Sequence, residues 1–401
     1  MRFIHTADWH LGRIFHGVHL TDDQAYVLEQ FIGLVHDARP DAVLIAGDIY
    51  DRSVPPHEAV QLLDEVLYRI VMDCRVPVLI IAGNHDSARR LGFGHRLLAR
   101  QGLHITSQPD NDLAPVVIED CHGPVYFCPV PYVDPPVVRD CLGVQDARGH
   151  DSAMAVLVDY WQARVPGGAR KVALAHAFVA GGEGSESERP LSIGGADKVQ
   201  VAHFRAFNYT ALGHLHKAQP AGEEQIRYAG SLMKYSFSEA EHKKSVTLVE
   251  MDARGVVTRE EIALCPRRDV RRLDGFLRDL LVGPPPGVSR EDYIMVTLRD
   301  SGAILDAMGK LREVYPNVLH IERPHLNCGG DLRGPGGDHR RLGELDLFAS
   351  FFQQVAGEEL TSEQQRVIAG IVEQIYRQDY RPEQGGGAAR LTEQRETGVL
   401  A

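Results

Sequence analysis

Residues 41–51 read DAVLIAGDIYD, and this stretch sets the class of fold. An unbroken apolar run from Ala42 to Ala46 is followed at once by Gly47 and Asp48. A short apolar run that ends in turn-forming residues is typical of a strand buried on both faces. Such strands belong to parallel sheets whose two faces are covered by helices. The stretch therefore predicts an α/β fold.

The sequence on either side of this strand supports that interpretation. Helical patterns occupy roughly residues 22–38 and 57–72, and four more strand-like runs cover 2–8, 76–86, 171–178 and 207–216. Beyond Ala218 the pattern becomes rich in β structure, and the runs 226–232, 244–252 and 256–264 are expected to be antiparallel strands. We expect a mixed sheet, or two packed sheets, flanked by helices.

Each of the five core strands ends in residues that can bind a metal ion. Parallel strands bring their carboxyl ends to one edge of a sheet, where ligands of open α/β sheets bind. One such pair is compatible with an ordinary turn, but five strand ends of this kind favour a metal site. The candidates are Asp8, His10, Asp48, Asn84, His85, His176, His214 and His216.

The chemistry of these side chains indicates the kind of site. Imidazoles combined with carboxylates and an amide suit Mn, Fe or Zn, whereas Mg and Ca prefer oxygen ligands alone. The candidates exceed what one ion binds, so two ions about 3.5–4 Å apart are expected, with Asp48 as the bridging carboxylate. Water activated by the two ions would attack a phosphate ester without a Ser or Cys nucleophile.

Two further residues are candidates for proton transfer. His85 directly follows a candidate ligand, so its ring is free to face the substrate and to protonate a leaving oxygen or stabilise developing charge. Asp51 either accepts the other ring proton of His85 or caps the helix that begins near residue 57.

The C-terminal part divides into smaller pieces. The proline-rich segment 282–292 is followed by a β-α-β pattern, a glycine-rich stretch at 327–341 and two amphipathic helical patterns. The first carries Leu345, Phe348, Phe352 and Val355, and the second begins with the capping-box pair Thr361 and Gln364. We expect a core domain at 1–270, a small domain at 271–340, a helical segment at 341–380 and a disordered tail at 381–401.

Composition narrows the class of protein. No apolar run approaches the roughly 20 residues of a membrane span, and the N-terminus lacks a signal-peptide pattern, so a cytoplasmic protein is expected. The six cysteines form no C-x-x-C pair. The net charge of -12 argues against a surface covered with basic groups for nucleic acid, although bound metal ions would add local positive charge.

The strand-end motifs DWHLG, GDIYD, GNHD, AH and GHLH resemble the five motifs of the calcineurin-like metallophosphoesterase superfamily. HLGRIFHG, GNHDSARRL, SESERPLSIGG, YAGSLMKYSFSE and HKKSV further resemble its bacterial DNA repair nuclease subunits. The resemblance implies a four-layer αββα sandwich, a small α/β capping domain that positions DNA, and C-terminal helices that bind a coiled-coil, SMC-like ATPase. It also implies a homodimer within a heterotetramer.

The resemblance assigns two Mn²⁺ ions and divides the ligands between them. One ion would be held by Asp8, His10, Asp48 and His216. The other would be held by Asp48, Asn84, His176 and His214. His85 would act in catalysis without binding metal. Which of His214 and His216 serves which ion is not settled by the spacing of the two histidines.

The function expected from this resemblance is a Mn²⁺-dependent DNA nuclease, a 3′→5′ exonuclease on duplex ends and an endonuclease on single-stranded or hairpin DNA. Arg13, Arg52, Arg89 and Arg90 are the candidate DNA contacts. A phosphomonoesterase or phosphoprotein phosphatase is the alternative, since GDIYDR resembles the phosphatase pattern GD-x-x-DR-G, although Ser53 stands where that pattern has glycine. A non-enzymatic structural subunit is disfavoured by the intact ligand set.

Overall fold

A computed structural model describes residues 1–109, 114–188, 198–302, 304–324, 348–349, 352–353 and 359–379. The chain divides into two compact units. The first comprises Met1–Thr297 and Met308–Glu322, and the second comprises Leu298–Ala307 and Arg323–Ala401. The first unit contains all the strand ends that the sequence singles out.

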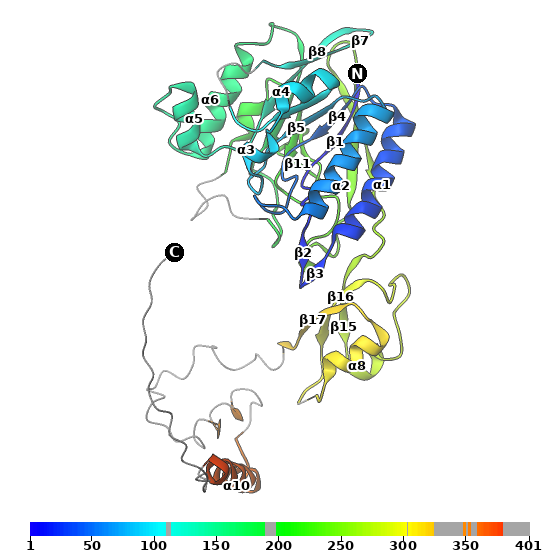
Figure 1. Cartoon of the computed structure of the whole chain (residues 1–401), viewed down its shortest axis with the longest axis vertical. Coiled ribbons are helices and arrows are strands. Elements are labelled where there is room, and N and C mark those ends of the chain that lie inside the picture. The colour runs from blue at the N-terminus through cyan, green and yellow to red at the C-terminus, as the bar shows by residue number, and fades with distance from the viewer. Residues whose placement is uncertain are drawn as a thin grey trace, which may run out of the picture. The chain divides into compact units, whose positions relative to one another are not determined.

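Two six-stranded sheets form the centre of the first unit (Figure 1). One has the order β14 (Val257–Ala263), β13 (Ser245–Met251), β1 (Arg2–Thr6), β4 (Ala42–Ile45), β5 (Val78–Ile81) and β6 (Leu103–Thr106). The other has the order β11 (Gln219–Ala221), β12 (Glu223–Tyr228), β10 (Tyr209–Gly213), β9 (Arg170–His176), β8 (Gly123–Val130) and β7 (Val116–Asp120).

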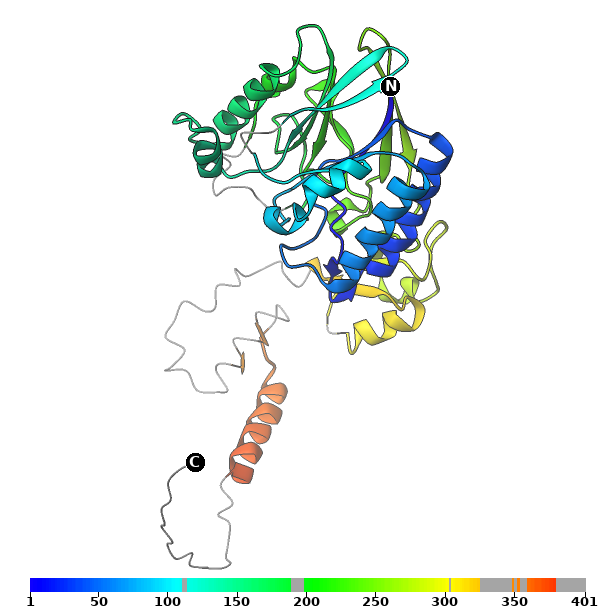
Figure 2. The same ribbon diagram turned by 45° about the horizontal axis from the view of Figure 1, so that its top comes forward.

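Alternation along the strands shows that the two sheets pack face to face between helices. On β4, Ala42 and Leu44 lie in the core between the sheets, whereas Val43 and Ile45 pack against the layer of α1 (Thr21–Ala38) and α2 (His57–Tyr68). Strand β8 repeats the pattern, since its last residues pack in the core of α5 (Pro135–Leu142) and α6 (His150–Gln162). Figure 2 shows the helices outside both sheets. The predicted αββα sandwich is confirmed.

The direction of one strand differs from the prediction. The run 226–232 was expected to be antiparallel like its successors, but β12 is parallel to β10 and antiparallel to the short β11. The chain leaves β10, forms β11 and then turns back through a tight connection, so β12 regains the direction of β10. Strands β13 and β14 are antiparallel, as predicted.

A three-stranded sheet is formed by β15 (Val270–Gly275), β16 (Tyr293–Leu298) and β17 (Val318–Glu322). Strands β16 and β17 are parallel, with α8 (Ala307–Val314) between them in the chain, which confirms the predicted β-α-β unit. The Tyr293 hydroxyl donates to Asp23 Oδ2 on α1 at 2.7 Å, and the Arg268 guanidinium lies 3.1 Å from the same oxygen. These contacts attach β16 to the first helical layer.

In the second unit the structure describes helix α10 (Ser362–Asp379). The predicted capping box is present, because the Gln364 N–H donates to Thr361 Oγ1 and the Thr361 N–H donates to Gln364 Oε1. Val367 and Ile371 are more than half exposed. The predicted helix at 345–357 lies mostly outside the described residues, and the predicted tail at 381–401 lies wholly outside them. Among the described helices, none is long and apolar enough to span a membrane.

Candidate metal centre

The backbone at the strand ends is strained in a way that brings the predicted ligands together. Asp8, His10, Asp48 and His214 all have positive φ angles, of 54°, 45°, 48° and 108°. A residue with a Cβ adopts this region at a cost of order 1–3 kcal/mol, and such residues cluster at functional sites. Four of the seven predicted ligands therefore occupy conformations that the surrounding structure must maintain.

Glycines allow the strand ends to approach each other closely. A Cβ on Gly213, at the end of β10, would lie 1.8 Å from the Ala46 carbonyl oxygen in the opposite sheet. A Cβ on Gly83, after β5, would lie 2.1 Å from Asp48 Oδ1. Only a residue without a side chain fits at either position, so both glycines are required by the close packing of the site.

The predicted ligands form two groups, and the first is built around His10 and His216. Their Nε2 atoms are only 3.0 Å apart, and Asp8 clusters with them as well as with Asp48 and His176. Asp48 Oδ2 lies 3.6 Å from His10 Nε2. All of these side chains are buried.

The second group is built around Asn84. Its Oδ1 lies 2.9 Å from His176 Nε2 and 3.2 Å from His214 Nδ1. Asp48 Oδ2 lies 3.6 Å from His176 Nε2. The same carboxylate oxygen is thus equally distant from one imidazole in each group.

The donor set fits metal ions. Burial lowers the pKa of the His10, His176 and His214 imidazoles, which keeps them in the neutral form that binds metals. Burial, and then the neighbouring charge of Asp48, raise the pKa of Asp8. The buried His10 Nδ1 has no hydrogen-bond partner among the described residues. Acceptor atoms that converge in this way, together with two close carboxylates, repel one another, and bound cations reduce this repulsion.

His85 lies beside the first group without joining its core. The His85 and His10 rings meet edge-on with their centroids 4.7 Å apart, and His85 Nε2 lies 4.0 Å from Asp48 Oδ2. Its Nδ1 donates to the main-chain carbonyl of Asp51 at 2.8 Å. The ring is therefore held with Nε2 directed towards the site.

Asp51 holds His85, but not through its carboxylate as the sequence suggested. That carboxylate accepts from Arg13 at 2.7 Å and lies 3.6 Å from His10 Nδ1. The alternative role as a helix cap is also wrong, because α2 begins after Pro56 with no side-chain cap. The carbonyl performs the expected task because the chain turns at residue 51 with this group facing His85.

The four arginines predicted to contact DNA lie at different places around the site. Arg13 is paired with Asp51, and exposed Arg52 lies 3.7 Å from the same carboxylate. Arg89 and Arg90 are exposed on the short helix α3 (Ala88–Leu91), where Arg90 donates to the Ser53 carbonyl at 2.8 Å.

Asp86 and Gln24 shape the site but were missed by the sequence analysis. The Asp86 carboxylate accepts the main-chain N–H groups of Gly83, Ile49 and Tyr50, which joins the GDIYD and GNHD turns. Burial and the charge of Asp48 raise the pKa of Asp86 to about 7. Gln24 on α1 donates to the Trp9 and His10 carbonyls. Asp86 is the last letter of GNHD, so its position beside the ligands was a usable signal.

A second set of missed residues surrounds His216. Ser187, Glu239 and Lys244 are buried together behind its ring. Although burial acts to raise it, the Lys244 ammonium holds the pKa of Glu239 well below its usual range. These residues fall within three of the stretches that carried the family resemblance, and that was their only signal.

Comparison with known proteins gives two family matches. Residues 1–218 match the calcineurin-like phosphoesterase family, and residues 266–356 match the family described as type 5 capsule protein repressor C-terminal domain. The chain is 31% identical over 372 residues to the SbcD subunit of the SbcCD nuclease from Staphylococcus saprophyticus, covering 93% of this chain and 98% of that protein. A solved structure from Thermus thermophilus is 13% identical and covers 65% of this chain and 98% of its own, with a TM-score of 0.35.

Proposed function

Because the chain belongs to the SbcD nuclease subunits of the calcineurin-like phosphoesterase family, we propose that it is a Mn²⁺-dependent DNA phosphodiesterase. It would act as a 3′→5′ exonuclease on duplex ends and as an endonuclease on single-stranded or hairpin DNA. The observation that carries the proposal is the position of Asp48 Oδ2, 3.6 Å from an imidazole of each ligand group.

The ligand groups support a specific assignment for two ions. One ion would be held by Asp8, His10, Asp48 and His216, and the other by Asp48, Asn84, His176 and His214. Two bound ions supply Lewis acidity and lower the pKa of a water that serves as nucleophile. His-rich coordination favours Mn²⁺ over Mg²⁺, so Mn²⁺ is the proposed ion.

His85 is the proposed proton donor to the departing 3′ oxygen. Since its Nδ1 proton is committed to the Asp51 carbonyl, Nε2 carries a proton only when the ring is an imidazolium. The carbonyl holds the ring in the same orientation before and after transfer, so proton transfer needs no rotation.

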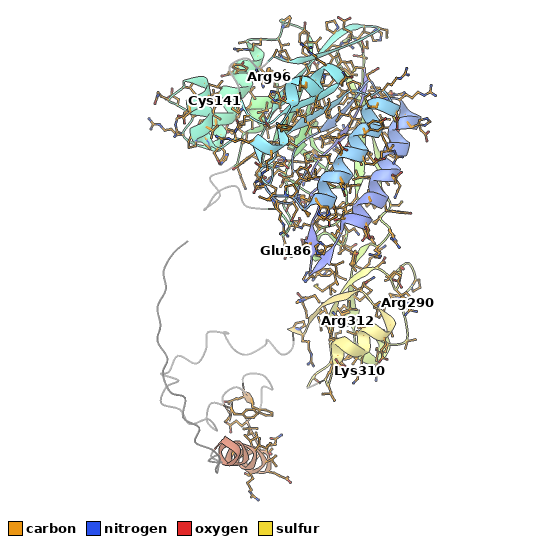
Figure 3. All side chains as sticks on the ribbon, viewed as in Figure 1. Arg96, Cys141, Glu186, Arg290, Lys310 and Arg312 are labelled. Atoms are coloured by element: carbon orange, nitrogen blue, oxygen red, sulfur yellow. The ribbon has the colours of Figure 1, made fainter. Side chains whose placement is uncertain are left out.

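DNA contacts are proposed at two places. Arg13, Arg52, Arg89 and Arg90 would contact phosphates near the site, as backbone contacts position a duplex without reading its sequence. Residues 271–340 would form the capping domain that positions DNA, with 1–270, 341–380 and 381–401 as the nuclease, helical and tail segments. Figure 3 labels Arg290, Lys310 and Arg312 in this part of the chain, and all three are exposed.

The proposed partner is an SbcC-like coiled-coil ATPase, as the name of the SbcCD relative suggests. Amphipathic helices in 341–380 would bind it, and the exposed Val367 and Ile371 on α10 supply part of an apolar face. A protein lacking residues 341–401 should then fail to co-purify with the ATPase. Retained binding would exclude these helices as the contact.

A homodimer within a heterotetramer is also proposed. An open apolar cavity of about 690 Å³ lies between α2, α3 and the short helix α4 (His95–Leu98). Phe93 and Leu97 beside it are 84% and 75% exposed, which is unusual for large apolar side chains unless a partner covers them. Light scattering should give twice the chain mass, and Phe93→Asp should halve it. A monomeric wild type would exclude the dimer.

The proposed location of the assembly is the cytoplasm, on the nucleoid.

The alternative function is a phosphomonoesterase or phosphoprotein phosphatase acting with the same ligands. One assay separates the two activities. The protein, loaded with Mn²⁺, is given linear duplex DNA and, separately, a phosphomonoester. The variants His85→Ala and, as an exposed control on α1, His36→Ala are assayed alongside. The proposal is supported if the rate of DNA degradation falls about 10²–10⁴-fold in His85→Ala and does not fall in the control variant. Turnover of the monoester without cleavage of DNA would reject it, and equal cleavage by wild type and His85→Ala would reject the role of His85.

A further inference from the structure

His216 is held at three points by side chains outside the set of ligands. Its main-chain N–H donates to Glu188 Oε1 at 2.8 Å, and its carbonyl accepts from Lys244 Nζ at 2.7 Å. Its ring Nδ1 lies 2.7 Å from Ser187 Oγ and 3.4 Å from Glu239 Oε1. The backbone and the ring of this residue are therefore both positioned from the side opposite the metal centre.

The protons in this network can be assigned from the number that each group carries. Ser187 Oγ is 2.5 Å from Glu239 Oε1, and Lys244 Nζ is 2.5 Å from Glu239 Oε2. A carboxylate paired with an ammonium only accepts hydrogen bonds, and a serine hydroxyl has one proton to give. The Ser187 proton therefore goes to Glu239, and the Ser187 oxygen accepts a proton from His216 Nδ1.

The neighbouring Ser185 does not change this assignment. Its Oγ lies 3.0 Å from Ser187 Oγ but donates to Glu188 Oε2 at 2.8 Å. Hydrogen bonds to charged groups are shorter and stronger than neutral ones, so each serine gives its proton to a carboxylate. The exposed Glu186 between them is labelled in Figure 3 and takes no part through its side chain.

The consequence for His216 is a single tautomer. With the proton on Nδ1, the Nε2 atom carries a lone pair directed at the group that contains His10 Nε2, 3.0 Å away. The other ligand group is supported differently, since His176 Nδ1 donates to the main-chain carbonyl of Ala46 at 2.8 Å. The network of charged side chains thus acts on the His10–His216 group and not on the Asn84 group.

We propose that Ser187, supported by Glu239 and Lys244, is a positioning residue that fixes the His216 tautomer and thereby sets the metal affinity of the His10–His216 site. The inference rests on the proposed assignment of His216 as a ligand. Groups that hold a ligating histidine from behind typically contribute 10–100-fold to metal affinity. The residue acts through His216 and touches neither substrate nor reacting atoms.

The test is a titration of the metal-free, full-length protein with Mn²⁺, followed by calorimetry and by electron paramagnetic resonance. Ser187→Ala should weaken one of two binding steps about 10–100-fold and leave the other step unchanged. Ser187→Thr keeps the hydroxyl and should bind like wild type. Ser301→Ala removes an exposed serine hydroxyl of the other compact unit and should also bind like wild type.

A second variant keeps the test decisive if Ser187→Ala does not fold. In Glu239→Gln the neutral amide oxygen is a weaker acceptor for the Ser187 proton than the carboxylate, so the Nδ1 tautomer of His216 is held less firmly and the same step should weaken. The proposal would be overturned if Ser187→Ala showed wild-type affinity in both Mn²⁺ binding steps, or if both steps were weakened equally. Two wild-type steps in His216→Ala would overturn the ligand assignment itself, which separates the two failures.

Discussion

Strand β1 and its extension carry two buried histidines five residues apart, and the two have opposite surroundings. His5 lies between the sheets, where Nδ1 is 3.0 Å from the Tyr209 hydroxyl and Nε2 is 3.1 Å from the Leu212 carbonyl. His10 lies at the edge, where Nε2 faces the imidazole nitrogen of His216 and Nδ1 has no hydrogen-bond partner among the described residues. Burial is complete in both cases.

The difference separates a structural histidine from a functional one. The Leu212 carbonyl can only accept, so His5 carries its proton on Nε2 and accepts from Tyr209 at Nδ1. Both ring atoms are satisfied by protein, and no ligand is needed. At the edge, the Nε2 atoms of His10 and His216 face each other 3.0 Å apart beside buried carboxylates, a set of donor atoms that a cation can complete. In this family that role belongs to metal ions.

Asp48→Asn breaks the edge most completely. The substitution keeps the shape of the side chain and the acceptor for the His85 N–H, but it removes the charge shared by both ligand groups. We expect both Mn²⁺ binding steps to weaken and DNA hydrolysis to fall beyond the roughly 10⁴-fold upper range for loss of a general acid. Calorimetry and a nuclease assay measure the two effects. Asp37→Asn, at the exposed end of α1, is the control. Loss of one step alone would show that Asp48 does not bridge.

Gly213→Ala alters the point where the edge meets the interior. The new Cβ would lie 1.8 Å from the Ala46 carbonyl oxygen and 3.0 Å from His176 Nδ1, and neither strand can move without opening the sandwich. We expect the free energy of unfolding to fall by about 3 kcal/mol or more, measured by urea denaturation of the metal-free protein.

Gly33→Ala is the matched control for that substitution. Gly33 lies on the exposed face of α1 with nothing within 4 Å of the new Cβ, so alanine should raise the free energy of unfolding by about 0.5–1 kcal/mol. Equal effects of the two substitutions would contradict the close approach at Gly213.

Much of this arrangement could be predicted because strand and ligand are neighbours in the chain. The run that ends at Asp48 contains both the apolar pattern of a buried strand and the residue that completes the site. The layers followed from the same patterns, since alternate residues of β4 contact different cores. The direction of β12 could not be predicted, because it depends on the hairpin with β11 and not on the apolar residues.

The support of the site was hidden for a different reason. The His85 ring is oriented by the Asp51 carbonyl, and main-chain groups leave no trace in a sequence of side chains. Ser187 is separated by 52 residues from Glu239, the near neighbour of Lys244, and meets both only in the folded chain. No periodicity or spacing relates them. The parts of the site that depend on long-range contacts were therefore the parts that sequence reasoning missed.

His5→Gln tests the histidine that lies between the sheets. Of the substitutions considered, it should change the free energy of unfolding at neutral pH the least. Burial lowers the pKa of His5 to about 3, whereas the unfolded chain binds this proton near pH 6.5. Between these values the unfolded state holds one more proton, so the contribution of His5 is fully present above pH 6.5 and is lost as the pH falls towards 3. Glutamine can donate to the Leu212 carbonyl and accept from Tyr209, but it does not titrate.

Denaturation of the metal-free protein from pH 7 to pH 4.5 should show this difference. The wild type should lose up to about 1.4 kcal/mol more than His5→Gln for each pH unit below 6.5. Subtracting the two curves cancels the edge histidines, which titrate in both proteins. If the free energies of unfolding of the two proteins changed in parallel with pH, His5 would be protonated inside the fold. The interpretation of His5 as a neutral histidine satisfied by protein groups would then be wrong.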